Sequence, residues 1–169
     1  WRHWGGMAAG VLLAFGAGWL GHVQWTAQQT GALLARNGLT REFVHQAALA
    51  HVVYQPEVRH PVEVGADQEQ HLVAWLSKRL GVSVQAPKLE EVGYSLVGGR
   101  LLPGESAGGP SPVAQFMYQD AKGLRLTLYV RTNTDASRET AFRFAQERNI
   151  GVFYWVDQKL GYALSGEIE

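Results

Sequence analysis

Hydrophobic and polar positions divide the chain into three parts with different patterns. Residues 4–23, WGGMAAGVLLAFGAGWLGHV, contain no Asp, Glu, Lys or Arg. At helical rise they would span about 30 Å, the thickness of a bilayer core. Arg2 precedes this run, and Trp4 and Trp19 lie near its ends, as in a membrane helix with a basic flank and an aromatic belt. The pattern predicts a single-pass membrane anchor over residues 1–25.

Two other interpretations of the apolar run stay open, a secretory signal and a buried helix of a soluble domain. Against a secretory signal, such a signal has a shorter apolar core followed by a small-x-small cleavage site, and GHVQWTAQQ does not offer one. Against a buried helix of a soluble domain, the run lacks a polar face. Gly6 and Gly10 have GxxxG spacing, which permits close contact between membrane helices and makes a homodimer one hypothesis. Because Arg2 and His3 precede the run, the positive-inside rule favours an N-terminus in the cytoplasm.

The second part, residues 26–66, is expected to be a helical stalk and linker. TREFVHQAALAHVVY (40–54) has apolar residues at helical spacing, and Thr40 is a candidate N-cap. The face predicted for burial comprises Phe43, Val44, Ala47, Ala48 and Val52. The two prolines of VYQPEVRHPVEVG predict an extended linker after this helix.

A second helix is predicted over DQEQHLVAWLSKRLG (67–81). Asp67 is the expected N-cap, and Gly81 has the place of a C-terminal glycine. The apolar stripe comprises Leu72, Trp75, Leu76 and Leu80. Both helices are amphipathic, so each is expected to cover part of a sheet.

The remainder, residues 93–168, predicts six short strands. Leu124, Leu126, Leu128 and Val130 alternate with Arg125, Thr127, Tyr129 and Arg131, and turn residues such as DAKG (120–123) separate the runs. We therefore expect an α+β fold in which the two helices pack on an antiparallel meander of about six strands. The domain is expected over residues 67–169, with helix 40–54 packing on it.

Charge and cysteine content exclude several classes of function. Lys plus Arg and Asp plus Glu each number 15, so the formal net charge is zero, and the chain has no cysteine. A nucleic-acid partner is not expected, because the basic patch that binds phosphates is missing. Disulfides, thiolate metal sites and cysteine nucleophiles are excluded.

The stretch LVGGRLLPG (96–104) has the glycine content of a phosphate-binding loop but not its pattern. Neither GxxxxGK[ST] nor GxGxxG occurs, and the loop PGESAGGPSP follows. Gly98 and Gly99 predict a β-bulge or a close approach of two backbones. Arg100 is interpreted as a surface charge, a carboxylate partner or part of a partner surface.

Catalytic and metal-binding motifs are missing from the sequence. The six histidines include no HExxH or HxxxH, although His60, His71 and Glu63 could converge through folding. Ser165 is not in a GxSxG elbow, and the adjacent Glu90 and Glu91 point in different directions. We predict no catalytic residues, cofactor or metal, and keep a hydrolase with a dispersed site as a third hypothesis.

The run Phe153, Tyr154, Trp155 is apolar on both of its strand faces. Phe153 and Trp155 share one face, and Tyr154 joins Val152 and Val156 on the other. Two interpretations stay open: a central strand that is covered on both sides, or an exposed patch for a partner. The candidate patch comprises Phe153, Trp155 and Arg100.

Six stretches together resemble the extracytoplasmic half of the membrane-anchored anti-sigma factors of proteobacteria, over most of residues 40–168. They are RHPVEVGADQEQHLVAWLSKRLG (59–81), GYSLVGGRLLP (93–103), AQFMYQD (114–120), LRLTLYV (124–130), TAFRF (140–144) and FYWVDQKLGYALSGEI (153–168). The resemblance implies a regulator that is not an enzyme, with a cytoplasmic domain that holds an alternative sigma factor and an outer domain that senses envelope conditions. Relief by regulated proteolysis or conformational change would involve a protease or another envelope protein.

This resemblance implies an inner-membrane protein with one membrane pass and its C-terminal domain in the periplasm. The sigma-binding domain would precede Trp1 and is missing from this chain, so the zinc-binding His/Cys motif of some relatives has no counterpart here. The alternative hypothesis is a membrane-anchored periplasmic scaffold that docks another envelope protein without a sigma factor.

Overall fold

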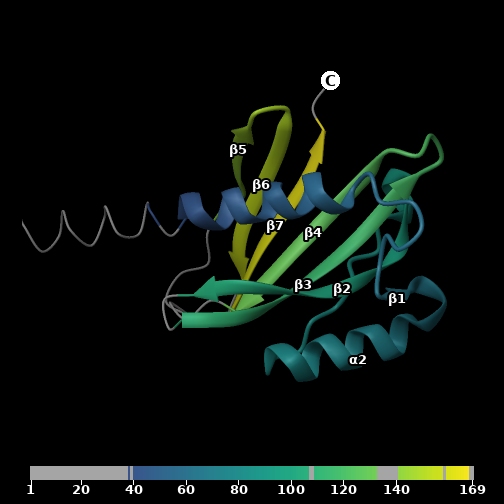
Figure 1. Cartoon of the computed structure of the whole chain (residues 1–169), viewed down its shortest axis with the longest axis horizontal. Coiled ribbons are helices and arrows are strands. Elements are labelled where there is room, and N and C mark those ends of the chain that lie inside the picture. The colour runs from purple at the N-terminus through teal and green to yellow at the C-terminus, as the bar shows by residue number, and fades with distance from the viewer. Residues whose placement is uncertain (1–37, 39, 107–108, 133–140, 158, 168–169) are drawn as a thin grey trace, which may run out of the picture. The chain divides into compact units, whose positions relative to one another are not determined.

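The computed structural model describes residue 38 and residues 40–106, 109–132, 141–157 and 159–167. Residues Glu42–Glu169 form one unit. Its described part has two helices and a seven-stranded antiparallel sheet (Figure 1), which confirms the α+β class. The strands are β1 (Val64–Gly65), β2 (Tyr94–Ser106), β3 (Gly109–Asp120), β4 (Arg125–Thr132), β5 (Arg143–Glu147), β6 (Ile150–Asp157) and β7 (Leu160–Glu167).

The strand order corrects the predicted meander. The sheet runs β1-β2-β3-β4-β7-β6-β5: after β4 the chain crosses to the edge strand β5 and returns inward through β6 to β7, which pairs with β4. In a meander, β5 would lie beside β4, but β7 takes this central place. Burial explains the difference, because β7 has buried residues along most of its length, whereas β5 has none. The charged strand β5, with Arg143 and Glu147, lies at the edge, where charged side chains oppose aggregation.

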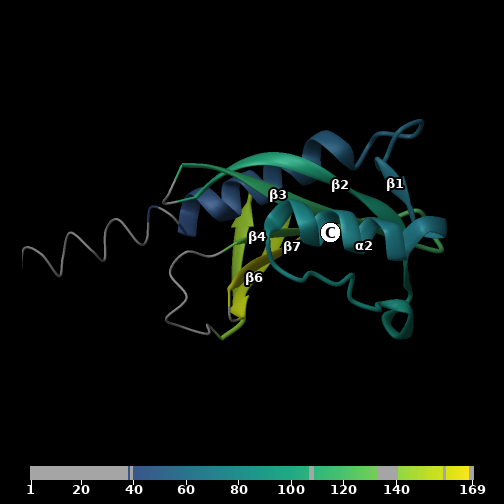
Figure 2. The same cartoon turned by 90° about the horizontal axis from the view of Figure 1, so that it is seen from below.

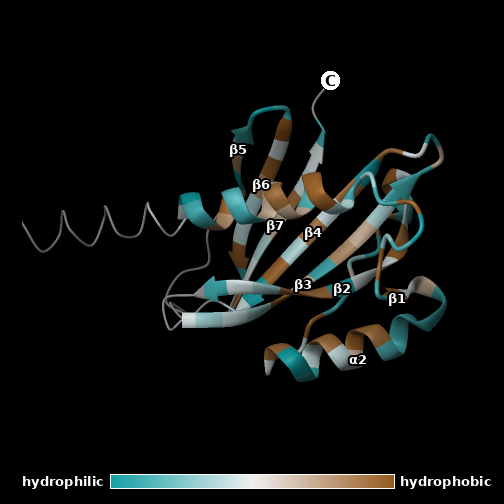
Figure 3. Ribbon diagram, viewed as in Figure 1, coloured by the Kyte–Doolittle hydropathy of each residue, from teal (hydrophilic) through white to brown (hydrophobic). Residues whose placement is uncertain are grey.

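The two helices pack on opposite faces of the sheet (Figures 1 and 2). Helix 40–54 lies over one core cluster, and α2 (Glu69–Leu80) lies over the other. Figure 3 shows apolar bands along both helices. The first cluster comprises Phe43, Val44, Ala47, Ala48, Leu102, Val113, Tyr129, Ile150, Val152 and Ala163. The second comprises Leu72, Leu76, Leu80, Val84, Ala114, Phe116, Tyr118, Leu128, Val130 and Leu160.

Helix α2 follows its predicted stripe, but its start differs from the prediction. Leu72, Leu76 and Leu80 are buried, and the helix ends at Gly81 with φ of +70°, the left-handed conformation that favours glycine. Asp67 does not cap it. A 3-10 turn, η1 (Ala66–Gln68), contains Asp67, and no side chain caps α2 at Gln68.

The glycine pair of LVGGRLLPG forms a bend in β2, as predicted, and not a phosphate loop. The register between β2 and β3 shifts between Leu96 and Gly98. Gly98 has φ of +148°, and a Cβ there would collide with the carbonyl oxygen of Val64 in the short strand β1. A side chain on Gly99 would meet the carbonyl oxygen of Gln115 at 2.8 Å. Both glycines therefore allow close backbone approach.

The buried face of helix 40–54 differs from the prediction at one turn. Phe43, Val44, Ala47 and Ala48 are buried, but Val52 is 52% exposed and His51 is 1% exposed. At about 100° per residue, position 51 lies two turns and about 80° beyond position 43, within the arc that the buried residues define. Position 52 lies about 100° farther round, outside this arc.

Candidate functional site

An aromatic surface covers one face of strands β5, β6 and β7. Phe142, Phe144 and Phe153 are 74%, 52% and 51% exposed, respectively, and Trp155 and Tyr162 are partly buried beside them. We call these five residues the aromatic surface. An apolar group of this size on a folded domain is typical of interaction sites.

Cross-strand pairing places these rings next to one another. Phe144 lies opposite Phe153, and Trp155 lies opposite Tyr162. The ring centroids are 4.9 Å apart in the first pair, and 5.0 Å apart in the second, which is stacked with an interplanar angle of 8°. Phe142 adds a tilted contact of 5.0 Å with Trp155. The rings hold one another in place, as cross-strand aromatic pairs do.

The aromatic surface is exposed because helix α2 covers the other half of the same sheet face. Phe153 pairs with Leu164, and Leu164 pairs with Leu128, which belongs to the α2 cluster, so all three share this face. Helix α2 packs on β1, β2 and β3 and leaves the β5–β6 side to solvent (Figure 1). Among the described residues, no helix lies above this apolar strand face.

The structure brings together two of the three residues of the predicted patch. Phe153 and Trp155 share the aromatic surface. Arg100 is 7% exposed and lies on the opposite sheet face, so it does not belong to the patch. Its guanidinium stacks 3.7 Å from the ring centre of Tyr54 and donates a 2.8 Å hydrogen bond to the carbonyl oxygen of His60.

Two phenylalanines of the aromatic surface were missed by the sequence analysis. The signal is visible in TAFRFAQE, where Phe142 and Phe144 alternate with Arg143 and Ala145.

The predicted anchor residues Trp4, Gly6, Gly10 and Trp19 lie outside the described residues.

Beneath helix 40–54 lies a second unusual feature, a buried layer of polar side chains that we call the polar seam. It comprises His51, Gln115, Thr127 and Ser165, all at most 1% exposed. His51 Nδ1 and Thr127 Oγ1 are 3.0 Å apart. Thr127 lies opposite Ser165 in the β4–β7 pair, and Gln115 lies diagonally across the β3–β4 pair.

Several atoms of the polar seam have no hydrogen-bond partner among the described residues. They are His51 Nε2, Gln115 Oε1, Gln115 Nε2 and Ser165 Oγ. Burial lowers the pKa of His51 from 6.5 to about 4, because the charged imidazolium is disfavoured away from water. The seam is therefore neutral at physiological pH and incompletely satisfied.

The seam lacks the hydrogen bonds of a Ser-His-carboxylate triad among the described residues. No hydrogen bond joins Ser165 Oγ to His51 within the described part of the chain, and no carboxylate orients the imidazole. Among the described residues, no group of three His, Asp or Glu side chains could hold a metal. His60, His71 and Glu63 thus do not converge into such a group.

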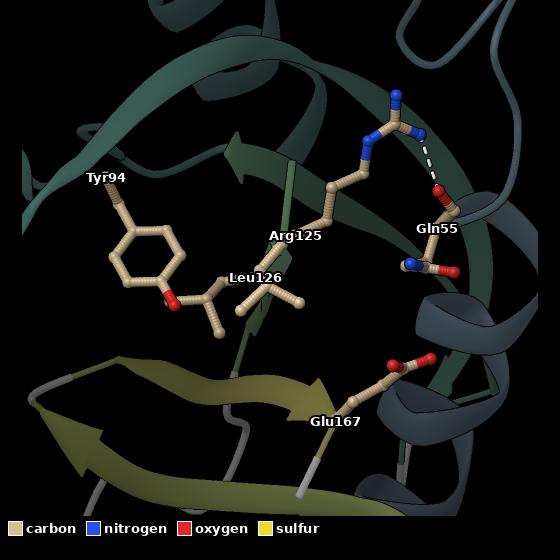
Figure 4. A pocket seen from close by; sticks show the side chains of 6 residues that line it. Gln55, Tyr94, Arg125, Leu126 and Glu167 are labelled. Atoms are coloured by element: carbon tan, nitrogen blue, oxygen red, sulfur yellow. Dashed lines mark hydrogen bonds between the residues drawn. The ribbon is translucent and has the colours of Figure 1, made fainter. Parts of the chain in front are cut away.

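Arginines fasten helix 40–54 to the sheet. The Arg125 guanidinium donates to the carbonyl oxygen of Gln55 (Figure 4). It also donates to the carbonyl oxygen of Glu57, at 2.6 Å, and both carbonyls lie just beyond the helix C-terminus. Both carbonyls belong to the turn that follows the helix, so Arg125 holds this turn against the sheet. Arg131 lies 4.1 Å from the ring centre of Phe43, and burial lowers the pKa of this guanidinium.

A pocket of about 40 Å³ lies beside Arg125. It is lined by Gln55, Tyr94, Leu124, Arg125, Leu126 and Glu167 (Figure 4). Ligand pockets measure roughly 300 Å³ or more, so this hollow is too small for a metabolite.

Comparisons with known proteins identify no relative. No family model, no curated protein and no solved structure matches the chain. Within the residues that the structure describes, no helix is both long enough and apolar enough to cross a membrane.

Proposed function

We propose that this chain is the extracytoplasmic sensor portion of a membrane-anchored anti-sigma factor, which controls an alternative sigma factor in response to envelope signals. The resemblance of most of residues 40–168 to the extracytoplasmic half of such anti-sigma factors carries the assignment, and the aromatic surface supports a binding role. This surface offers exposed rings for a partner on a domain whose described side chains form no catalytic or metal-binding arrangement. In this proposal the domain acts by binding a partner and changing conformation.

Strands β5 and β6 supply a physical path from that surface to helix 40–54. Phe144 and Phe153 lie on one face of these strands, and Val152 and Ala145 on the other face pack in the cluster of Phe43. A partner that shifts the aromatic rings therefore acts on strands that support the helix. In the sequence, this helix is the described element closest to the apolar run 4–23, the predicted inner-membrane anchor.

The alternative is a membrane-anchored periplasmic scaffold. The same aromatic surface favours it, because exposed rings dock an envelope protein equally well when no sigma factor is involved.

Co-purification of the full-length native protein from detergent-extracted membranes tests the proposal. We expect a stoichiometric alternative sigma factor. The double variant Phe144→Ser, Phe153→Ser should keep the sigma factor and lose an envelope partner, and Val58→Ser, at a site that is 81% exposed, is the control. Absence of any sigma factor across growth and stress conditions would refute the anti-sigma assignment and favour the scaffold.

A further inference from the structure

Helix 40–54 is attached to the sheet in two different ways along its length. Its first half packs Phe43, Val44 and Ala47 into an apolar cluster. Its second half places His51 over the polar seam. The fully buried apolar residues of the helix end at Ala48, and the second half adds only the partly buried Ala50 and Tyr54. Burial of apolar groups is the principal force that holds a helix on a sheet, so the second half gains less from it.

Docking of the second half leaves polar atoms with unmet hydrogen bonds. Both side-chain polar atoms of Gln115, with Ser165 Oγ and His51 Nε2, lack partners among the described residues. Burial of such atoms is unfavourable, and exposure to water would relieve it. The docked state therefore carries a penalty that a detached helix does not.

The contacts that fasten the helix C-terminus are ones that water can replace. Arg125 donates to the carbonyl oxygens of Gln55 and Glu57, and Arg100 stacks on Tyr54. A carbonyl and a guanidinium released from such a contact are both readily hydrated, so water restores part of the free energy that the contact supplies.

The outer surface of the same turns is apolar. Leu49, Val52 and Val53 are 50%, 52% and 61% exposed. The C-terminal half thus presents its histidine to the sheet and its larger aliphatic residues to solvent, the reverse of an ordinary amphipathic helix. This half of the helix is poorly matched to its docked position.

From these observations we infer that helix 40–54 is the switch of the domain: starting from its C-terminal half, it detaches from the sheet while the sheet and α2 stay folded. The inference deepens the proposed sensor function and rests on it for its biological role. A partner then needs only to favour one of two positions of the helix. Local opening of this kind costs less free energy than global unfolding.

Cysteine labelling tests the inference directly, because the chain has no cysteine of its own. Ala47 belongs to helix 40–54 and points toward the sheet, whereas Ala114 belongs to β3 and lies in the cluster under α2. Both are 0% exposed. The variants Ala47→Cys and Ala114→Cys of the 169-residue chain are matched reporters on opposite sheet faces. A thiol reagent is added under native conditions, in the regime in which labelling tracks the open population.

We expect Ala47→Cys to react at least tenfold faster than Ala114→Cys. Adding Gln115→Leu to the Ala47→Cys chain removes two unpaired polar atoms and should slow labelling by at least threefold. Ala48→Cys serves as a second reporter if the first variant folds poorly, and thermal melting confirms that the variants are folded. Equal labelling rates for the two faces, or faster labelling after Gln115→Leu, would overturn the inference. Neither result depends on whether a sigma factor binds.

Discussion

Acid should destabilise this domain through one buried histidine. The pKa of His51 is lowered by burial from 6.5 to about 4. Between these values the unfolded chain binds a proton that the folded chain does not, so stability falls as the pH falls from about 6.5 to about 4. Above pH 6.5 the imidazole is neutral in both states and the penalty vanishes. Over the whole interval this difference corresponds to about 3 kcal/mol.

Urea denaturation between pH 7.5 and pH 4.5 measures this effect. The free energy of unfolding of the parent chain should decline by up to about 1.4 kcal/mol per pH unit more steeply than that of His51→Gln. Loss of the contact with Thr127 lowers the stability of the variant at every pH, but it does not change the slope. Val58→Ser, at an exposed site, is the control and should keep the parent slope. Parallel curves for the parent and His51→Gln would refute the assignment of a buried, neutral histidine.

Three further predictions concern the bend, the helix end and the aromatic surface. Gly98→Ala should lower the free energy of unfolding by about 2–4 kcal/mol, because its Cβ would collide with the carbonyl oxygen of Val64. Gly109→Ala is the control, because Gly109 also has a positive φ but its Cβ would meet no atom, and it should cost about 1 kcal/mol. Equal losses in urea melts would contradict this prediction. Arg125→Met should cost about 1–3 kcal/mol in the same melts by removing two charge-assisted hydrogen bonds, and an unchanged midpoint would contradict it. Phe144→Ser should reduce binding of a hydrophobic dye while changing stability by less than about 1 kcal/mol, since the ring is half exposed; a large stability loss would show that the ring belongs to the core.

Local sequence patterns were sufficient for six of the strands and for the apolar stripe of helix α2. Six of the seven strands coincide with predicted runs, because alternation and turn residues act within a few positions. Strand β1 has only two residues, Val64 and Gly65, too few for a periodic signal. The pairing of β4 with β7 is a long-range choice that depends on which strand buries more apolar surface, and a local pattern does not encode it.

The aromatic surface was predictable only in part, because exposure depends on what covers a strand. Phe153 and Trp155 were assigned correctly to one face of β6, since side chains alternate along a strand. Whether that face is covered depends on the position of α2 over β2 and β3, which lie far away in the sequence. Arg100 was misplaced for the same reason: its strand neighbours do not reveal that Tyr54 lies above it.

The polar seam shows how an alternating strand can mislead. In LRLTLYVRT, Arg125, Thr127, Tyr129 and Arg131 form the more polar series, which an isolated hairpin would turn toward solvent. In the structure this series faces helix 40–54, and Thr127 and Tyr129 are 0% and 2% exposed. The helix accommodates it by presenting Phe43 to Arg131 and His51 to Thr127, and the turn that follows the helix presents its carbonyls to Arg125. His51 departs from the apolar pattern of the helix because it faces the polar series of β4. Conversely, Thr127 of that series can be buried because His51 lies opposite it.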